Sequence, residues 1–408
     1  MKKVIGMLVV VAFASSMAGA ELLKNLKYSG TMDVKATSGD HSVTATKASF
    51  SNVNSRISLG MNFDLNDEIN AQVTAEKTDY RNYGTASQSV DGLTASIFFS
   101  EAYINLKNVF GVNHKIGKQF YGKPGDIVIY VGPSYGPVGA LANFSVSSLD
   151  GWYGEWKKDK LTVAALAAKV SENSATTPMD KDLYGVTAGY DFSEIVKPAV
   201  YVYQSMDKAV LGLTDTLMVV GAKAEGKYQG FGYGAEFAMN SGKDKPATQK
   251  YQGSAIKVNV DYALDAKEIG KFDFMGEYAM GSGDKAGAAK NEGFQAISSN
   301  YLPGLIFGVN GVGAATSGLT NLTTFNVGAK FMPKQIEKLS VGAKFYNFAY
   351  TEKVGLADAI GTELDFCAGW KHSENVGLHA TYAMFTPDKK FADKDAETMF
   401  GLNLAVKF

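Results

Sequence analysis

The chain has 408 residues and a formal net charge of −1, from 40 Lys and Arg against 41 Asp and Glu. This balance supplies no basic patch, so it excludes a nucleic-acid-binding protein. The single cysteine, Cys367, excludes an intramolecular disulfide. Gly is abundant at 44 residues, Pro is scarce at 9, and the mean hydropathy of −0.08 is what alternating apolar and polar faces produce.

The first twenty residues have the pattern of a secretory signal peptide. Two lysines precede the apolar run 4–13, and the small residues Ala-Gly-Ala at 18–20 form a cleavage site. An uncleaved membrane anchor is the alternative interpretation. We therefore expect residues 1–20 to be the signal peptide and residues 21–408 to be one domain. No run of about 18 apolar residues follows residue 20, so membrane spans there would have to be strands.

Apolar and polar residues alternate with a period of two along most of the remaining chain. Segments 26–36 and 57–63 show this pattern, and Asn66 and Asp67 then mark a tight turn before it resumes at 69–76. The last two of these segments predict strands joined as a hairpin. Further segments of this kind lie at 184–192, 231–239, 256–262, 272–280, 325–331, 339–345, 364–370, 376–384 and 399–408.

The connections between the predicted strands alternate in length, as in transmembrane barrels with short periplasmic turns and longer external loops. Short turns are expected near residues 66, 108, 158, 194, 229, 265, 335 and 373. Longer polar segments are expected at 37–48, 77–94, 120–145, 171–182, 206–214, 241–252, 281–322, 350–359 and 386–395. The pattern predicts an all-β, antiparallel up-and-down barrel of about 18 strands with an aqueous lumen. The segments 146–157 and 198–205 are the least regular, which leaves 16 strands as the alternative.

The last ten residues predict how the barrel closes. Phe400, Leu402, Leu404, Val406 and Phe408 fall on one face of an extended strand. A closed barrel pairs its final strand with its first and leaves no sheet edge. The segment resembles the C-terminal strand of bacterial outer-membrane barrels, which commonly ends in Phe, and this implies that Phe408 is an assembly signal. Aromatic residues at strand ends favour interfacial girdles over a soluble sandwich, so we expect the outer membrane of a Gram-negative-type envelope.

The side chains expected to face the lumen carry charges of both signs, which predicts weak ion selectivity. Charges of this kind either brace the wall as pairs or contact the solute. The candidates for lining the pore are Arg56, Glu101, Tyr103, Lys257, Asp261, Lys330 and Lys344.

The segment 120–145 is too apolar to stay in water, because it contains the run Ile-Val-Ile-Tyr-Val at 127–131. The sequence Gly-Lys-Gln-Phe-Tyr-Gly before it, after the fifth predicted strand, resembles the place in general porins where a loop folds into the barrel. That resemblance implies a constriction, although a loop packed on the barrel mouth and a constriction formed by 281–322 are the alternatives. The constriction candidates are Lys118, Lys123, Asp126, Tyr130 and Tyr135.

Five short segments resemble the alginate-export family of outer-membrane barrels. They are 101–108, 115–119, 283–285, 300–308 and 361–365. The resemblance implies an 18-strand barrel, and it makes export of an anionic polysaccharide such as alginate an alternative function.

The sequence favours a porin for passive diffusion of small hydrophilic solutes, with sugars or oligosaccharides as the solutes that Tyr, Trp and mixed charges suit. A polyuronate conduit would be expected to have an Arg-rich lumen, and the arginines here are Arg56 and Arg81. A barrel hydrolase is a weaker alternative, because no Ser-His or metal-ligand spacing occurs. We expect no catalytic residue, metal or cofactor. The expected partners are outer-membrane lipids, small solutes and the outer-membrane assembly machinery, for a monomer or a homotrimer.

Overall fold

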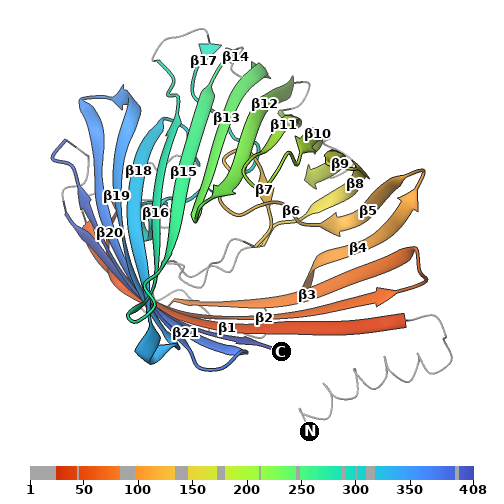
Figure 1. The fold of residues 1–408 in the computed structure, drawn as a ribbon. Helices are drawn as coiled ribbons and strands as arrows, with labels where there is room; N and C mark the ends of the chain where they lie inside the picture. Colours follow the sequence, from red (N-terminus) through yellow and green to blue (C-terminus); the bar gives the residue numbers. More distant parts are fainter. Residues whose placement is uncertain are drawn as a thin grey trace.

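The computed structural model describes residues 24–43, 46–82, 97–133, 146–171, 180–210, 213–244, 249–285, 290–299, 301–308, 318–390 and 395–408. They form a closed antiparallel barrel of 18 strands, which confirms the predicted fold and the higher of the two strand counts (Figure 1). The strands are β1 (Lys24–Val43), β2 (Thr46–Asp64), β3 (Ile69–Asn82), β4 (Phe98–Val109), β5 (Val112–Gln119), β8 (Leu149–Lys158), β9 (Leu161–Ser171), β10 (Lys181–Tyr190), β11 (Lys197–Val210), β12 (Leu213–Tyr228), β13 (Phe231–Asp244), β15 (Ser254–Asp265), β16 (Gly270–Gly281), β18 (Leu322–Pro333), β19 (Leu339–Val354), β20 (Ala357–Lys371), β21 (Val376–Pro387) and β22 (Glu397–Lys407).

The barrel closes between its first and last strands. β1 pairs with β22 from Thr31 opposite Lys407 to Asp40 opposite Thr398. The Gly30 amide donates to the Phe408 carbonyl at 2.7 Å, and the Phe408 amide donates to the Gly30 carbonyl at 3.0 Å. The predicted pairing of the terminal strand with the first is confirmed. A side chain at Gly30 would overlap the Phe408 ring, so the aromatic terminus requires glycine there.

The period of two separates an apolar outer face from a polar inner face. Ile57, Leu59, Val327 and Phe400 point outward and are between 40% and 53% exposed. Exposure of this kind along many strands is unfavourable in water and favourable in lipid. Tyr28, at the turn end of β1, is 81% exposed, as an interfacial aromatic residue would be.

All eight short turns lie where the sequence predicts them, whereas several predicted loops belong to strands. β1 and β2 together cover almost all of 37–48, and β19 and β20 leave only 355–356 between them. The strands continue because paired backbone groups satisfy one another even beyond the apolar belt. The signal peptide expected at 1–20 lies outside the described residues.

The packed core lies inside the barrel. It contains the short strands β6 (Tyr121–Gly122) and β7 (Tyr130–Val131), which Figure 1 shows within the curve of the wall. Two more short strands, β14 (Gln249–Tyr251) and β17 (Lys290–Asn291), pair in parallel near the rim. The helical turns of the described residues are η1 (Gly304–Gly308) and η2 (Lys334–Ile336). No helix in this part of the chain is long and apolar enough to cross a membrane.

Candidate functional site: the loop-narrowed lumen

The segment 120–133 leaves the end of β5 and folds into the barrel. β6 and β7 form its hairpin, and two glycines with positive φ, Gly122 at 80° and Gly125 at 85°, shape the turn between them. The Lys123 amide donates to Oδ2 of Asp126 at 2.9 Å, and the Asp126 amide donates to the Lys123 carbonyl at 3.0 Å. The loop tip therefore has a fixed shape of its own.

The apolar run 127–131 explains why this loop enters the barrel. Ile127 is fully buried, and the next four side chains are at most 8% exposed. They pack in one cluster with Leu149 of β8 and with Tyr201 and Tyr203 of β11. Burying side chains of this size contributes about 1.5–3 kcal/mol each, so the apolar contacts are sufficient to hold the loop.

A second segment, 290–308, joins the first inside the barrel. Ile129 forms a parallel bridge with Ser298, and the Ile297 amide donates to the Val128 carbonyl at 3.0 Å. The Ser299 hydroxyl donates to the Asp126 carbonyl at 3.1 Å. The sequence offers 120–145 and 281–322 as constrictions, and a described part of each, 120–133 and 290–308 without residue 300, lies inside the barrel and packs on the other.

Glu363 of β20 fastens the second segment to the wall. Its side chain is 1% exposed and accepts hydrogen bonds from the backbone amides of Ile306 and Phe307, each at 2.8 Å. The Phe307 ring stacks on Phe348 of β19 with 4.1 Å between centroids. The body formed by the two loops thus extends from β5 to β20.

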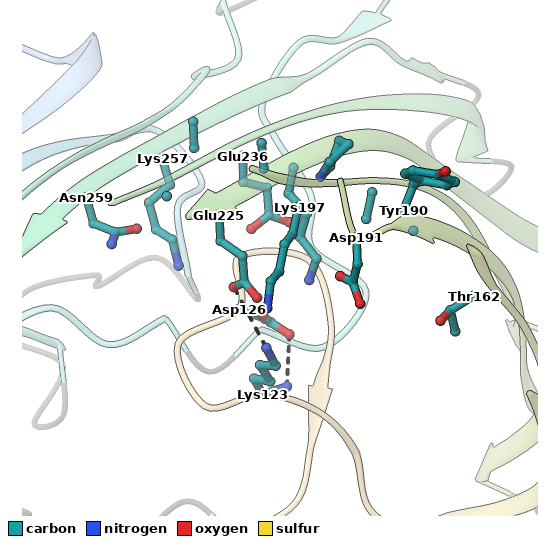
Figure 2. A pocket seen from close by; sticks show the side chains of 17 residues that line it. Lys123, Asp126, Thr162, Tyr190, Asp191, Lys197, Glu225, Glu236, Lys257 and Asn259 are labelled. Carbon is teal, nitrogen blue, oxygen red and sulfur yellow. Dashed lines mark hydrogen bonds and ion pairs between the residues drawn. The ribbon is translucent and has the colours of Figure 1, made fainter. Parts of the chain in front are cut away.

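The tip of the first loop docks against the inner wall formed by β9 to β15 (Figure 2). A cavity of about 260 Å³ remains between the tip and this wall, and we call it the cavity below the loop tip. Nζ of Lys257 donates to the Gly125 carbonyl at 2.7 Å, and Nζ of Lys123 lies 3.9 Å from Oε2 of Glu225. The Lys123 and Glu225 side chains are 71% and 67% exposed, so their ion pair contributes little, and the Lys257 contact is the stronger anchor. The charged side chains that line this cavity are Lys123, Asp126, Asp191, Lys197, Lys223, Glu225, Glu236 and Lys257.

Lys118 does not belong to the constriction. Lys118 of β5 lies opposite Asp150 of β8, and two residues earlier Ile116 lies opposite Trp152. Residues two apart in a strand point to the same face, so all four side chains lie on the outer face of the barrel. Nζ of Lys118 lies 2.7 Å from Oδ2 of Asp150. The strict alternation from outward-facing Ile116 already requires this direction, so the prediction that Lys118 points inward was wrong.

The other constriction candidates have different positions. Lys123 and Asp126 form the loop tip at the cavity below it. Tyr130 is 8% exposed, and its hydroxyl donates to the Pro133 carbonyl at 2.7 Å, so it stabilises the loop from within. Burial raises the pKa of the Tyr130 hydroxyl, which therefore stays protonated at neutral pH. Tyr135 lies outside the described residues.

The seven candidates for lining the pore all lie on the inner face of their strands. Arg56 is only 7% exposed, because Nε contacts Glu76 at 2.9 Å and Nη1 contacts Asp33 at 3.1 Å. It braces the wall. Lys257 anchors the loop tip. Among the remaining five, Glu101 accepts a hydrogen bond from Thr74, Lys344 lies over the Tyr346 ring, and Tyr103, Asp261 and Lys330 are half-buried or exposed to the lumen.

An inner-face group of carboxamides, absent from the predicted site residues, lies at the turn ends of β2, β3 and β4. Asn62, Asn70, Gln72 and Asn105 are hydrogen-bonded to one another, and we call them the carboxamide group. Each occupies an inward position of its own strand, which the alternation indicates. Their contact depends on the register between strands, which a single segment does not reveal. No group of three or more His, Cys, Asp or Glu that could hold a metal ion occurs among the described residues.

Three solved structures show the same fold. Pseudomonas aeruginosa OccK5 (OpdH) has a TM-score of 0.63 at 11% identity, covering 95% of this chain and 100% of that chain. Acinetobacter baumannii OccAB4 has a TM-score of 0.60 at 13% identity, covering 95% and 99%. Pseudomonas aeruginosa OpdK, solved with vanillate, has a TM-score of 0.62 at 12% identity, covering 95% and 99%.

These likenesses establish the architecture. No protein-family model matches the sequence, and no curated protein matches it, so the resemblance to the alginate-export family is not supported. A closed barrel with an apolar outer belt satisfies every strand's backbone within a bilayer, which is how proteins span the bacterial outer membrane. The chain is therefore an outer-membrane β-barrel.

Proposed function

We propose that this protein is an outer-membrane channel for passive diffusion of small hydrophilic solutes, among them uncharged, hydroxyl-rich molecules such as sugars. The observation that carries the proposal is the interior of the barrel, in which 18 strands carry polar side chains on their inner face and cavities of about 260 Å³ and 460 Å³ remain beside the apolar cluster of the two loops. A barrel of this size is too wide for side chains alone to fill.

The charge distribution supports weak ion selectivity. Eight charged side chains line the cavity below the loop tip, four basic and four acidic. Rings of side chains with the same charge select ions, whereas balanced charges mainly hydrate the lumen and form ion pairs along the wall. One neighbour in fold, OpdK, was solved with the small molecule vanillate, which is consistent with solute passage. The partners that we propose are the lipids around the belt, the solute and the machinery that assembles outer-membrane barrels.

Conductance in a planar bilayer tests the proposal. We expect the purified protein to give discrete, stable current steps, with similar permeability to small cations and anions. Insertion is checked independently by the heat-dependent shift in electrophoretic mobility that folded barrels show. Protein that is folded and inserted by this measure but passes no current would contradict the channel function.

A further inference from the structure

We propose that the inner wall at the turn ends of β2, β3, β4, β5 and β8 is a binding subsite for an uncharged saccharide. The inference rests on the proposed channel function, since a solute reaches this wall through the lumen. The subsite is separate from the cavity below the loop tip, because the two share no lining residue and the other cavity is lined by the next part of the wall, β9 to β15.

This part of the wall contains a cavity large enough for a small ligand. A cavity of about 460 Å³ is lined by side chains from β2 to β8, including Asn70, Asn105, Asn113, Lys115 and Tyr153. Small-molecule sites usually measure about 300–1,000 Å³. The cavity therefore has room for a sugar of one or two rings.

Two members of the carboxamide group, Asn70 and Asn105, line the cavity, and Asn62 and Gln72 support them from beside it. Asn62 donates to Oδ1 of Asn70 at 3.1 Å, and Asn70 donates back to Oδ1 of Asn62 at 2.9 Å. Asn62 also donates to Oε1 of Gln72 at 3.1 Å. Asn70 further contacts Asp64 at 3.0 Å, which fixes the orientation of its amide. Side chains held in this way lose little additional freedom when they bind a ligand.

Asn105 retains capacity for a ligand. Its amide donates to Oδ1 of Asn70 at 3.1 Å, and within the described part of the chain its carbonyl oxygen accepts no hydrogen bond. A carboxamide offers two donors and a two-site acceptor. The half-buried Asn105 can therefore donate to one hydroxyl and accept from another, which suits the vicinal hydroxyls of a sugar.

The rest of the lining favours a ligand without net charge. Asp64 and Glu155 oppose Lys107 and Lys115, so the charged side chains of the cavity cancel. Tyr153 presents an aromatic ring beside them, and its hydroxyl donates to Oε2 of Glu155 at 3.2 Å. An aromatic ring offers an apolar surface to the C–H face of a sugar while its hydroxyl remains bonded.

Current blockade by maltose tests the subsite. We expect maltose, added to the side of the turns, to interrupt the ion current of the wild-type channel in a concentration-dependent way. Asn105→Leu should weaken the blockade about tenfold, because two hydrogen bonds to the sugar are lost. Asn105→Ala serves as a second variant if the leucine prevents folding. The matched control is Asn347→Leu, since Asn347 pairs with the outward-facing Phe325 on the outer face of the barrel and should leave the blockade unchanged.

The outcomes separate this inference from the channel proposal. Current steps that maltose does not block would overturn the subsite and leave the channel intact. Blockade that is equally strong in wild type and both Asn105 variants would also overturn it, as would blockade lost only in Asn347→Leu. Absence of current from inserted wild-type protein would instead defeat the channel function itself. Gluconate, which carries hydroxyls and a carboxylate, should block less than maltose.

Discussion

Two parts of the inner wall differ in their polar side chains, and we call β9 to β15 the charged wall and β2 to β4 the carboxamide wall. The wall of β9 to β15 carries lysines and carboxylates, and it holds the loop tip through the contact of Lys257 with Gly125. The wall of β2 to β4 carries the carboxamide group, whose members bond to one another. Lys257 of the charged wall thus anchors a loop, whereas the amides of the carboxamide wall hold one another.

This difference has a physical consequence for the channel. Interactions of exposed charges weaken as salt screens them over about 10 Å at 0.1 M, while hydrogen bonds between neutral amides do not depend on ionic strength in this way. Changes on the charged wall should therefore alter ion selectivity in a salt-dependent manner. Changes on the carboxamide wall should alter the handling of neutral solutes instead.

Removing the loop tip tests the charged wall most strongly. Deleting residues 123–132 should raise single-channel conductance several-fold, since the deletion removes the buried run 127–131 and the partner of Ser298. The segment 290–308 should also become more sensitive to protease, because the two loops form one body. Unchanged conductance in a correctly folded deletion variant would show that the tip does not narrow the pore.

Loss of the Arg56 ion pairs, which brace the carboxamide wall, should have the next largest effect, and this effect is on the stability of the barrel. Arg56→Met leaves Glu76 buried at 2% exposure without its cation, and it also removes the contact with Asp33. Breaking a buried ion pair of this kind costs about 3–5 kcal/mol, so the temperature of the heat-dependent mobility shift should fall. Arg56→Lys keeps the charge, so it should lower this temperature less than Arg56→Met does. Equal stability of all three proteins would refute the bracing role.

A pair of lysine substitutions compares the inner and outer faces. Lys257→Met should shift selectivity towards cations at low salt, because it removes a positive charge from a narrow passage, and the shift should fade as salt rises. Lys118→Met is the matched control, since Lys118 lies on the outer face beside Asp150. Reversal potentials in a salt gradient give the measurement. A shift with Lys118→Met as large as with Lys257→Met would place Lys118 in the pore after all.

The smallest effect on conductance is expected where β1 pairs with β22 and closes the barrel, because this pairing belongs to neither wall. Phe408→Asp should leave the current steps of inserted protein unchanged. A charge near the interface costs from near zero to about 1 kcal/mol, so equilibrium stability should change little. The amount of folded protein in the outer membrane should nevertheless fall if Phe408 is the assembly signal. Wild-type amounts in membrane fractions would count against that role.

Much of the fold can be predicted from local patterns. Alternation places Ile57 and Leu59 outside and Arg56 inside, and residue spacing locates all eight turns. The same rule, applied from Ile116, would have placed Lys118 outside. The extent of the strands is less accessible, because pairing with a neighbour keeps residues such as 37–43 extended although their composition suggests a loop.

The sequence by itself determined the two-faced strands, their number to within two and the closing segment, since these follow from the period of two and from backbone hydrogen bonding in a bilayer. Only the tertiary structure decided which loops meet and which polar groups touch. Ile129 and Ser298 are 169 residues apart in the chain, and Asn70 and Asn105 are 35 apart. Such contacts depend on strand register and on the path of a loop across the lumen, which are set by the packing of the whole barrel.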